Sequence, residues 1–475
     1  MLRALTFDDV LLLPQKSDIL PKDVSLRTKL TNNLELNIPL ITAAMDTVTE
    51  AKTAIAIAKQ GGIGIIHKNM SIEAQAEQVA KVKRSEALIV ENPVTVAPNQ
   101  TLADLWFIKK SQGISSFPVV QNGKLVGLVT NRDIRFESNG LKKVSEMMTK
   151  DLVTVNKKVG ASEAIEILRK NKVEKLPIVD KQGKLQGLIT STDILKKQKY
   201  PNTLTDHQGK LRVGAAIGPK DFDRIEKLIS AGVDVIVLDT AHGHSLNVIN
   251  GIKKIKKEFQ IELIAGNVGT AQGAKDLLNA GADAIKVGIG PGVICTTRII
   301  TGCGVPQLSA VQACVKAVGE DIPVISDGGI RYSGDIVKAL AAGASSVMIG
   351  SLFAGCDETP GKLIYLNNRK FKQYRGMGSL GAMIEGSKDR YMQADVMDKD
   401  KLVPEGVEGI VPFKGTVAEV CFQLLGGLKA GMGMQGAKNI AVLQKNAEFI
   451  ELTFAGLKES HPHDIKITEE APNYS

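Results

Sequence analysis

The chain has 475 residues, 43% of them hydrophobic and 23% charged, which is globular composition over a length that favours more than one domain. Its 60 Lys and Arg against 51 Asp and Glu give a net charge of +9, but no long basic run or aromatic stripe accompanies it. We therefore expect a solvated basic surface rather than nucleic-acid binding. The start of the chain lacks the pattern of a signal peptide, and no apolar run reaches membrane-spanning length, so we expect a soluble protein.

Five cysteines are present, and none has CxxC spacing. This pattern argues against a disulfide framework or structural zinc, and it favours a reducing, cytoplasmic location.

Residues 89–202 contain a repeat, with copies at about 89–146 and 147–202. Each copy predicts a strand, a helix, a strand marked by Pro118 or Pro177, a turn, another strand and a Thr-x-x-Asp-Ile motif. Such a unit does not bury its sheet alone, so we expect the two copies to pack as a pseudo-symmetric pair.

This repeat resembles tandem cystathionine-β-synthase (CBS) domains, which bind purine nucleotides in many proteins. The resemblance assigns a regulatory nucleotide site to the Thr and Asp of the last motif in each copy: Thr130, Asp133, Thr190 and Asp193. The alternative interpretation is that these residues only cap the helix that follows.

The flanking segments, 1–88 and 203–475, form one α/β pattern. Apolar, β-branched runs that end in polar or Gly-rich turns recur eight times, at 38–45, 61–67, 212–218, 233–242, 261–267, 282–292, 322–329 and 344–351. Helix-like stretches separate most of them, which is the pattern of a (β/α)8 TIM barrel with catalytic residues at the carboxyl ends of its strands. A doubly wound sheet is the competing fold, but no GxGxxG opens a helix after an early strand.

The loop after the sixth predicted strand, GIGPGVICTTRIITGCGVPQ, contains a candidate nucleophile. Cys295 stands beside Thr297 and Arg298, a setting that favours a reactive thiol. The glycines of this loop allow sharp turns whose carbonyls face a cation. The other cysteines lack this setting and are interpreted as structural: Cys303, Cys314, Cys356 and Cys421.

The seventh and eighth predicted strands end in Ser326-Asp327-Gly328-Gly329 and Gly350-Ser351. A carboxylate at a strand end accepts hydrogen bonds from a ribose diol, and Gly-rich turns at the last two barrel strands commonly bind phosphate. Together they indicate a nucleoside monophosphate site.

Residues 385–409 form a long polar stretch without clear periodicity, which predicts either a lid over the site or a disordered segment. Arg390, Tyr391 and Glu405 are placed to act on a substrate if the lid closes.

The strings GPGVICTTRIITGCGVPQ, SDGGI, YRGMGSLGAM, DRY and LVPEGVEG resemble those of bacterial inosine-monophosphate dehydrogenases, as do ALTFDDVLLLP and ESHPHDIKITEEAPNY at the two ends. The resemblance covers essentially the whole chain. It implies that Cys295 attacks C2 of inosine monophosphate (IMP), that hydride passes to NAD, and that hydrolysis then gives xanthosine monophosphate.

The resemblance also implies the binding residues. The substrate contacts Asp327, Gly329, Gly350, Ser351, Tyr374, Gly376, Met377, Gly378 and Glu405. The NAD side includes Asp239, Asn267 and Lys286. Potassium is held by the carbonyls of Gly290, Gly292 and Cys295, together with Glu459, Ser460 and His461 of a neighbouring subunit. The shared site implies a homotetramer, and tetramers pair into octamers if their CBS modules meet.

For the hydrolytic step the resemblance makes Arg390 the base, with Tyr391 and Thr297 orienting the water. Because arginine has a very high pKa, a relay through Thr297 and Glu405 is the alternative. One position departs from the family, which usually has Ser two residues before the nucleophile, whereas this chain has Val293. We expect weaker substrate binding from that loss.

Two other functions compete. Guanosine-monophosphate reductase shares the barrel, the cysteine and the phosphate turns but uses NADPH and needs no water-activating lid, so the DRY motif argues against it. A non-catalytic nucleotide-sensing protein is the second alternative.

Overall fold

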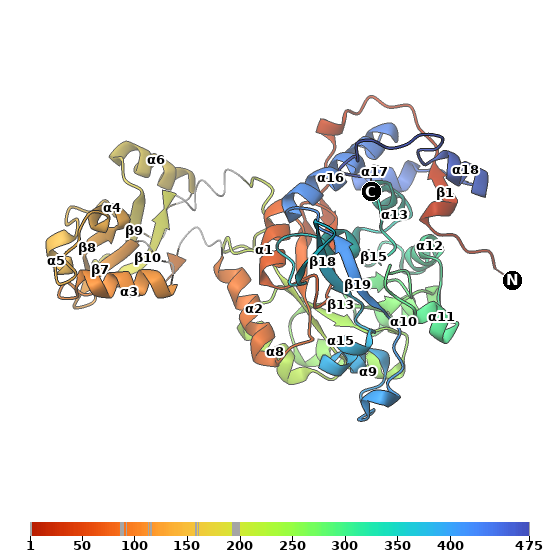
Figure 1. Ribbon diagram of the computed structural model, residues 1–475, viewed down its shortest axis with the longest axis horizontal. Coiled ribbons are helices and arrows are strands. Elements are labelled where there is room, and N and C mark those ends of the chain that lie inside the picture. Colours follow the sequence, from red (N-terminus) through yellow and green to blue (C-terminus); the bar gives the residue numbers. More distant parts are fainter. Residues whose placement is uncertain are drawn as a thin grey trace. The chain divides into compact units, whose positions relative to one another are not determined.

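The computed structural model in Figure 1 describes residues 2–85, 90, 91, 93–112, 114, 116–156, 159, 161–191 and 200–474. The chain divides into two compact units. The larger comprises Met1–Lys83, Asn202–Asp206 and Leu211–Ser475, and the smaller comprises Arg84–Pro201 and His207–Lys210.

The larger unit is built on a closed parallel barrel, which confirms the predicted fold. Its strands follow one another around the barrel in the order β11-β12-β13-β14-β15-β16-β4-β5. Their bounds are Leu40–Thr42 (β4), Ile63–Ile66 (β5), Gly214–Ile217 (β11), Val235–Asp239 (β12), Glu262–Val268 (β13), Ala284–Val287 (β14), Val324–Asp327 (β15) and Ser346–Ile349 (β16).

Helices surround the barrel (Figure 1). The longer ones are Ala51–Gln60 (α1), Ile72–Arg84 (α2), Phe222–Ser230 (α8), Leu246–Glu258 (α9), Ala271–Asn279 (α10), Gln307–Val318 (α12), Ser333–Ala341 (α13) and Val417–Met434 (α16). Polar caps fix where several begin, because a side-chain oxygen satisfies a free backbone N–H of the first turn. Thr270 accepts from the Gly273 N–H in this way, and Thr416 forms a capping box with Glu419.

Side chains along each barrel strand alternate between two cores. In β12, Val235 and Val237 belong to the core inside the barrel, whereas Ile236 and Leu238 pack outward against the helices. This alternation is the two-residue period of a strand, and every one of these side chains is fully buried. The next residue, Asp239, therefore points into the mouth of the barrel.

A three-stranded antiparallel sheet and short helices lie beyond the eighth barrel strand. The sheet contains β17 (Leu363–Leu366), β18 (Arg369–Arg375) and β19 (Glu408–Pro412) in that order. The short elements there are Ser351–Ala354 (α14), Leu380–Glu385 (α15), Ser387–Tyr391 (η3), Lys399–Lys401 (η4), Ile440–Asn446 (α17) and Phe454–Glu459 (α18). One further short helix, α11 (Thr297–Thr301), lies earlier in the chain, between β14 and β15. Near the N-terminus lie η1 (Phe7–Asp9), η2 (Pro21–Asp23), the β2–β3 pair (Thr28–Lys29, Glu35–Leu36) and β1 (Val10–Leu12), which pairs with β20 (Phe449–Glu451).

The smaller unit contains two similar sets of strands. Its elements are β6 (Val90–Glu91), α3 (Leu102–Gln112), β7 (Ser116–Gln121), β8 (Lys124–Thr130), α4 (Asn131–Ile134), α5 (Val144–Met147), α6 (Ala161–Asn171), β9 (Lys175–Val179) and β10 (Leu185–Thr190). The same parallel bridge occurs in both copies of the repeat, between Val96 and Val119 and between Val155 and Ile178.

The segments that lead into and out of the smaller unit are joined at one lysine of the larger unit. Nζ of Lys83, in the last turn of α2, lies 2.8 Å from Asp206 and 2.9 Å from Asp234. Lys83 is buried, so its charge needs these partners. Within the described part of the chain, no helix is long and apolar enough to cross a membrane.

Candidate active site

A buried lysine organises the mouth of the barrel. Lys286, the third residue of β14, is 1% exposed, and its Nζ lies 2.8 Å from Oδ1 of Asp239 and 2.6 Å from Oδ2 of Asp327. It also donates to Oδ1 of Asn267. Asp239, Lys286 and Asp327 stand at inward positions of their strands, where alternation places them. Asn267 follows a register shift in β13, between Gly266 and Val268, which changes the alternation at this point. Because the burial of a charge is costly unless it is paired, the cluster fixes both carboxylates in place.

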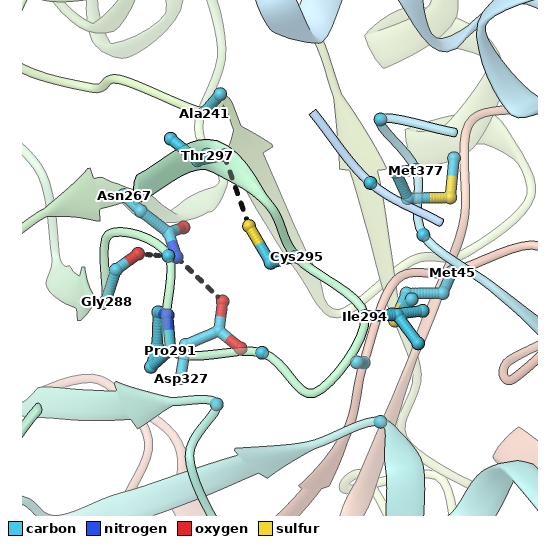
Figure 2. Close-up of a pocket in the computed structure, with 18 of the residues that line it drawn as sticks. Met45, Ala241, Asn267, Gly288, Pro291, Ile294, Cys295, Thr297, Asp327 and Met377 are labelled. Carbon is cyan, nitrogen blue, oxygen red and sulfur yellow. Dashed lines mark hydrogen bonds between the residues drawn. The ribbon is translucent and has the colours of Figure 1, made fainter. Parts of the chain in front are cut away.

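Asn267 extends this cluster toward the cysteine loop. Its Nδ2 donates to the Gly288 carbonyl at 2.8 Å and to Oδ2 of Asp327 at 2.9 Å, and Figure 2 shows both bonds. A Cβ on Gly288 would lie 2.2 Å from the Asp327 carbonyl oxygen, so only glycine allows these strand ends to approach so closely.

Cys295 lies on the loop after β14, with its thiol beside a hydroxyl. Sγ lies 3.1 Å from Oγ1 of Thr297, as Figure 2 shows. The loop is held by Arg298, whose Nε and Nη2 donate to the Ile289 and Val305 carbonyls at 2.9 and 2.6 Å. Partial burial lowers the pKa of Arg298, while the neighbouring Cys295 acts in the opposite direction. The thiol therefore has a fixed position and a cationic neighbour, as nucleophilic catalysis requires.

The other cysteines do not share this setting. Burial raises the pKa of Cys314 to about 12, and it raises the pKa of Cys356 and Cys421 as well. Those three thiols are inert core groups, as predicted. The structural interpretation of Cys303 was wrong, because this residue is exposed at the end of the α11 segment rather than packed.

The Gly-rich strand ends line the opposite side of the pocket. Gly328 and Gly329 have φ of +87° and +79°, a left-handed conformation that turns the chain directly after Asp327. Gly350 and Ser351 follow β16, and a Cβ on Gly350 would lie 2.9 Å from Oη of Tyr374. Tyr374 is 4% exposed, and burial raises its pKa, so its hydroxyl stays protonated and able to donate.

The segment that contains Met377 and Gly378 is joined to the cysteine loop through residues 405–407. The Thr296 N–H donates to the Glu405 carbonyl at 2.9 Å, and the Glu405 N–H donates to the Gly378 carbonyl at 2.9 Å. Gly376 in turn donates to the Val407 carbonyl at 3.0 Å. These bonds bring together three segments that lie far apart in the sequence.

The segment 385–409 is structured and enters the pocket. Its 3-10 helix η3 places Arg390 against Asp239, with which it forms an ion pair, and the Arg390 carbonyl accepts from the Ala241 N–H at 3.1 Å. Among the described residues, no group accepts a hydrogen bond from the buried Nε of Arg390. Burial raises the pKa of Tyr391, which Arg390 partly offsets. The segment is therefore ordered rather than disordered, as the lid interpretation requires.

One pocket therefore collects most of the predicted residues. Its lining includes Cys295, Thr297, Arg390, Tyr391, Glu405, Asp327, Gly329, Gly350, Ser351, Tyr374, Gly376, Met377, Gly378, Asp239, Asn267, Lys286, Gly290 and Gly292. Val293 lines it too and is 60% exposed.

Other predicted residues lie elsewhere. Glu459 and Ser460 are exposed at the end of α18, and His461 hydrogen-bonds Tyr474 at 2.8 Å. In the smaller unit, Thr130 and Asp133 form the capping box of α4, with the Thr130 N–H 2.7 Å from the Asp133 carboxylate. Thr190 ends β10, and Asp193 lies outside the described residues.

Sequence reasoning missed two residues that hold the site together. Gln307 is fully buried, and its Nε2 donates to the Val287 carbonyl at 2.8 Å and also reaches Ser326 and Asp327. Lys68 follows the end of β5 and pairs with Asp389 in the lid. The position of Lys68 after a predicted barrel strand was the available signal, because barrel chemistry lies at these ends.

Fold and site together define a (β/α)8-barrel enzyme whose pocket contains Cys295, the Gly-rich ends of the last two strands and the segment 385–409. The chain belongs to the IMP dehydrogenase / GMP reductase domain family, whose model matches residues 4–463.

Similar proteins agree with that placement. Inosine-5'-monophosphate dehydrogenase of Helicobacter pylori is 57% identical over 99% of this chain and 98% of its own length, and that of Aquifex aeolicus is 57% identical over 99% and 97%. Among solved structures, a cysteine-to-alanine variant of Trypanosoma brucei GMP reductase in complex with guanosine 5'-monophosphate matches with a TM-score of 0.91. It is 39% identical and covers 98% of this chain and 99% of that one.

Proposed function

We propose that this chain oxidises inosine 5'-monophosphate to xanthosine 5'-monophosphate with NAD and water, a step of guanine nucleotide biosynthesis. The observation that carries the proposal is the presence of Cys295 and the lid residues Arg390 and Tyr391 in one pocket. Relatives at 53–57% identity over nearly the whole chain bear the name of this dehydrogenase.

In the first half-reaction, the thiol of Cys295 gives up its proton to solvent, Sγ bonds to C2 of the purine, and the C2–H bond breaks with loss of hydride. NAD, when bound, would supply the hydride acceptor. Asp327 is positioned to hold the ribose hydroxyls, while the turns at Gly329 and Gly350 offer backbone N–H groups to the phosphate. A thioimidate links Cys295 to the purine at the end of this step.

In the second half-reaction, water attacks C2 and the thiol of Cys295 leaves with a proton. We propose that Arg390 acts on this water, because its buried Nε lacks a hydrogen-bond acceptor among the described residues and lies in the pocket of Cys295. A relay through Thr297, 3.1 Å from the sulfur, with Glu405 is the second candidate.

The residues around Asp239 fit the dinucleotide only when the lid is open. Arg390 pairs with Asp239 in the closed lid, so the same carboxylate is unavailable to NAD. We propose that NADH departs before the lid closes, with Asp239 and Asn267 on the NAD side and Lys286 holding them in place. One site thereby serves hydride transfer and hydrolysis in turn.

A spectrophotometric assay tests the proposal directly. We expect NADH to appear when IMP and NAD are supplied, and no consumption of NADPH with guanosine monophosphate. Consumption of NADPH with guanosine monophosphate would instead assign the GMP reductase activity of the structural neighbour, which the family description includes. No turnover with either nucleotide would favour a non-catalytic nucleotide-sensing protein.

We propose a potassium site at the carbonyls of Gly290, Gly292 and Cys295. Backbone oxygens suit a hard cation, and Gly290 has φ of +74°, which turns the loop at this point. Within the described residues, no cluster of His, Cys, Asp or Glu side chains offers an alternative metal site.

Glu459, Ser460 and His461 would complete the potassium site from a second copy, in a homotetramer. Replacing K⁺ by Na⁺ in the assay tests the cation, and light scattering tests the assembly. A K⁺-independent rate or a monomer would contradict this part of the proposal.

We also propose that the smaller unit binds purine nucleotides and lets tetramers pair into octamers. Its support is the repeat of strand pairings that places Thr130 and Thr190 at equivalent strand ends. Calorimetric titration with adenine and guanine nucleotides tests it.

The five free thiols support a reducing, cytoplasmic location.

A further inference from the structure

The lid helix η3 is attached to the barrel by two consecutive charged residues. Arg390 pairs with Asp239 at the end of β12, and Asp389 pairs with Lys68, two residues beyond the end of β5. Strand β11 lies between β5 and β12 in the barrel, so the helix spans three neighbouring strand ends. Of these two pairs, the reaction proposed above uses only the Arg390 pair.

We propose that the Lys68–Asp389 ion pair is a latch that positions Arg390 by holding the lid closed; this inference rests on the proposed function. Lys68 and Asp389 are positioning residues, because neither lines the pocket that contains Cys295.

Partial burial strengthens the Lys68–Asp389 ion pair. The Lys68 side chain is 11% exposed and that of Asp389 33%, so water screens the attraction less than at an open surface. Oδ1 of Asp389 is buried and, within the described residues, accepts no hydrogen bond, so Lys68 is the main group that compensates this carboxylate.

A second carboxylate increases the need for Lys68. The carboxylates of Asp389 and Asp221 both lie close to Gly218, the residue after β11. A Cβ on this glycine would lie 3.0 Å from Oδ2 of Asp389 and 3.3 Å from Oδ2 of Asp221. Arg224 lies 3.5 Å from Asp221 and partly compensates it. Without Lys68, closure would bring Asp389 beside Asp221 with no cation of its own.

Loss of the latch should therefore shift the lid toward the open state without changing the chemistry at Cys295. We expect the closed-to-open ratio to fall roughly tenfold, the effect of one charged hydrogen bond. The NADH burst should stay the same, because hydride transfer uses the open lid. Steady-state turnover should fall by up to the same factor, and NAD should inhibit more strongly because it re-enters the open site.

The test uses Lys68→Met and Asp389→Asn in the full-length protein, together with the exchanged pair Lys68→Asp/Asp389→Lys. Lys256→Met is the matched control, because Lys256 forms a comparable pair with Asp283 at 2.7 Å on the outer side of the barrel. Burst amplitude, turnover and NAD inhibition are measured for each variant. Hydrogen exchange at the Ala241 and Gln393 amides, which bond to the Arg390 and Lys388 carbonyls, reports the lid independently of activity.

The latch is supported if both single variants lose turnover equally, keep the burst, exchange faster at these amides and are rescued by the exchanged pair. Unchanged turnover and exchange would overturn it. A raised KM for NAD in Lys68→Met alone would overturn it too, since Lys68 would then be a ligand of NAD. A wild-type protein that makes no NADH would contradict the proposed function, while the exchange measurement would still decide whether the latch exists.

Discussion

In the mouth of the barrel, Nζ of the fully buried Lys286 lies 2.6 Å from Oδ2 of the partly exposed Asp327. The same ammonium reaches Asp239, so one buried cation sets the spacing between the two carboxylates on either side of the pocket.

Replacing Lys286 with Met should destabilise the protein and abolish activity, since it leaves Asp327 without a cation and Asp239 with only Arg390 of the lid. We expect a loss of about 3–5 kcal/mol in the free energy of unfolding, typical of a broken buried pair. Urea unfolding measures it. Lys256→Met breaks a more exposed pair and should cost about 1 kcal/mol or less; equal losses in the two variants would contradict the role of Lys286.

Alkylation should distinguish the five thiols. In the native protein we expect iodoacetamide to label Cys295 and Cys303 but not Cys314, whose pKa burial raises to about 12, nor Cys356 and Cys421. Mass spectrometry after native and denaturing treatment checks this. Bound IMP should protect Cys295 and leave Cys303 reactive; protection of Cys303 alone would contradict the assigned nucleophile.

Arg390→Ala should slow hydrolysis far more than hydride transfer. Loss of a group that acts on water lowers a rate by roughly 10²–10⁴-fold, so turnover should fall by that factor while the pre-steady-state NADH burst remains. Stopped-flow absorbance separates the two steps. If the burst slowed as much as turnover, Arg390 would not be specific to the hydrolytic step, and the relay through Thr297 and Glu405 would be favoured.

Val293→Ser should strengthen substrate binding. The side chain lines the pocket and is 60% exposed, so a hydroxyl there has room to reach a phosphate. A hydrogen bond to a charged group is worth about 1.5–3 kcal/mol, which corresponds to a fall in the KM for IMP of at least roughly tenfold. Val293→Ala, which shortens the side chain without adding a hydroxyl, is the control; a similar KM in both variants would contradict this explanation.

The sequence predicted the barrel and the place of Asp327 at the end of a strand for one physical reason. A strand alternates with a period of two, so a polar residue that ends a buried apolar run has a defined direction once the strand is recognised. The loop containing Cys295 was predictable for a similar reason, because it directly follows such a strand.

The lid was less predictable. Residues 385–409 contain no hydrophobic period because two short 3-10 helices and the start of β19 occupy them. The Lys68–Asp389 pair joins residues 321 positions apart, and no local pattern in either segment indicates the other. The sheet formed by β17, β18 and β19 was missed because its strands lie mostly on the surface, where apolar alternation is weak.

The ion pairs of Lys83 stabilise the point at which the smaller unit is inserted into the barrel. The ammonium of Lys83 joins helix α2, which leads into the smaller unit, to Asp206 in the segment that leads out of it. The two ends of the insertion are therefore held together within the larger unit. The barrel therefore does not depend on the inserted unit to hold α2 beside the returning segment. The third partner of the joint, Asp234, directly precedes β12, and Asp239 ends that strand. A single five-residue strand therefore has the anchor of the insertion at one end and the docking point of the lid at the other.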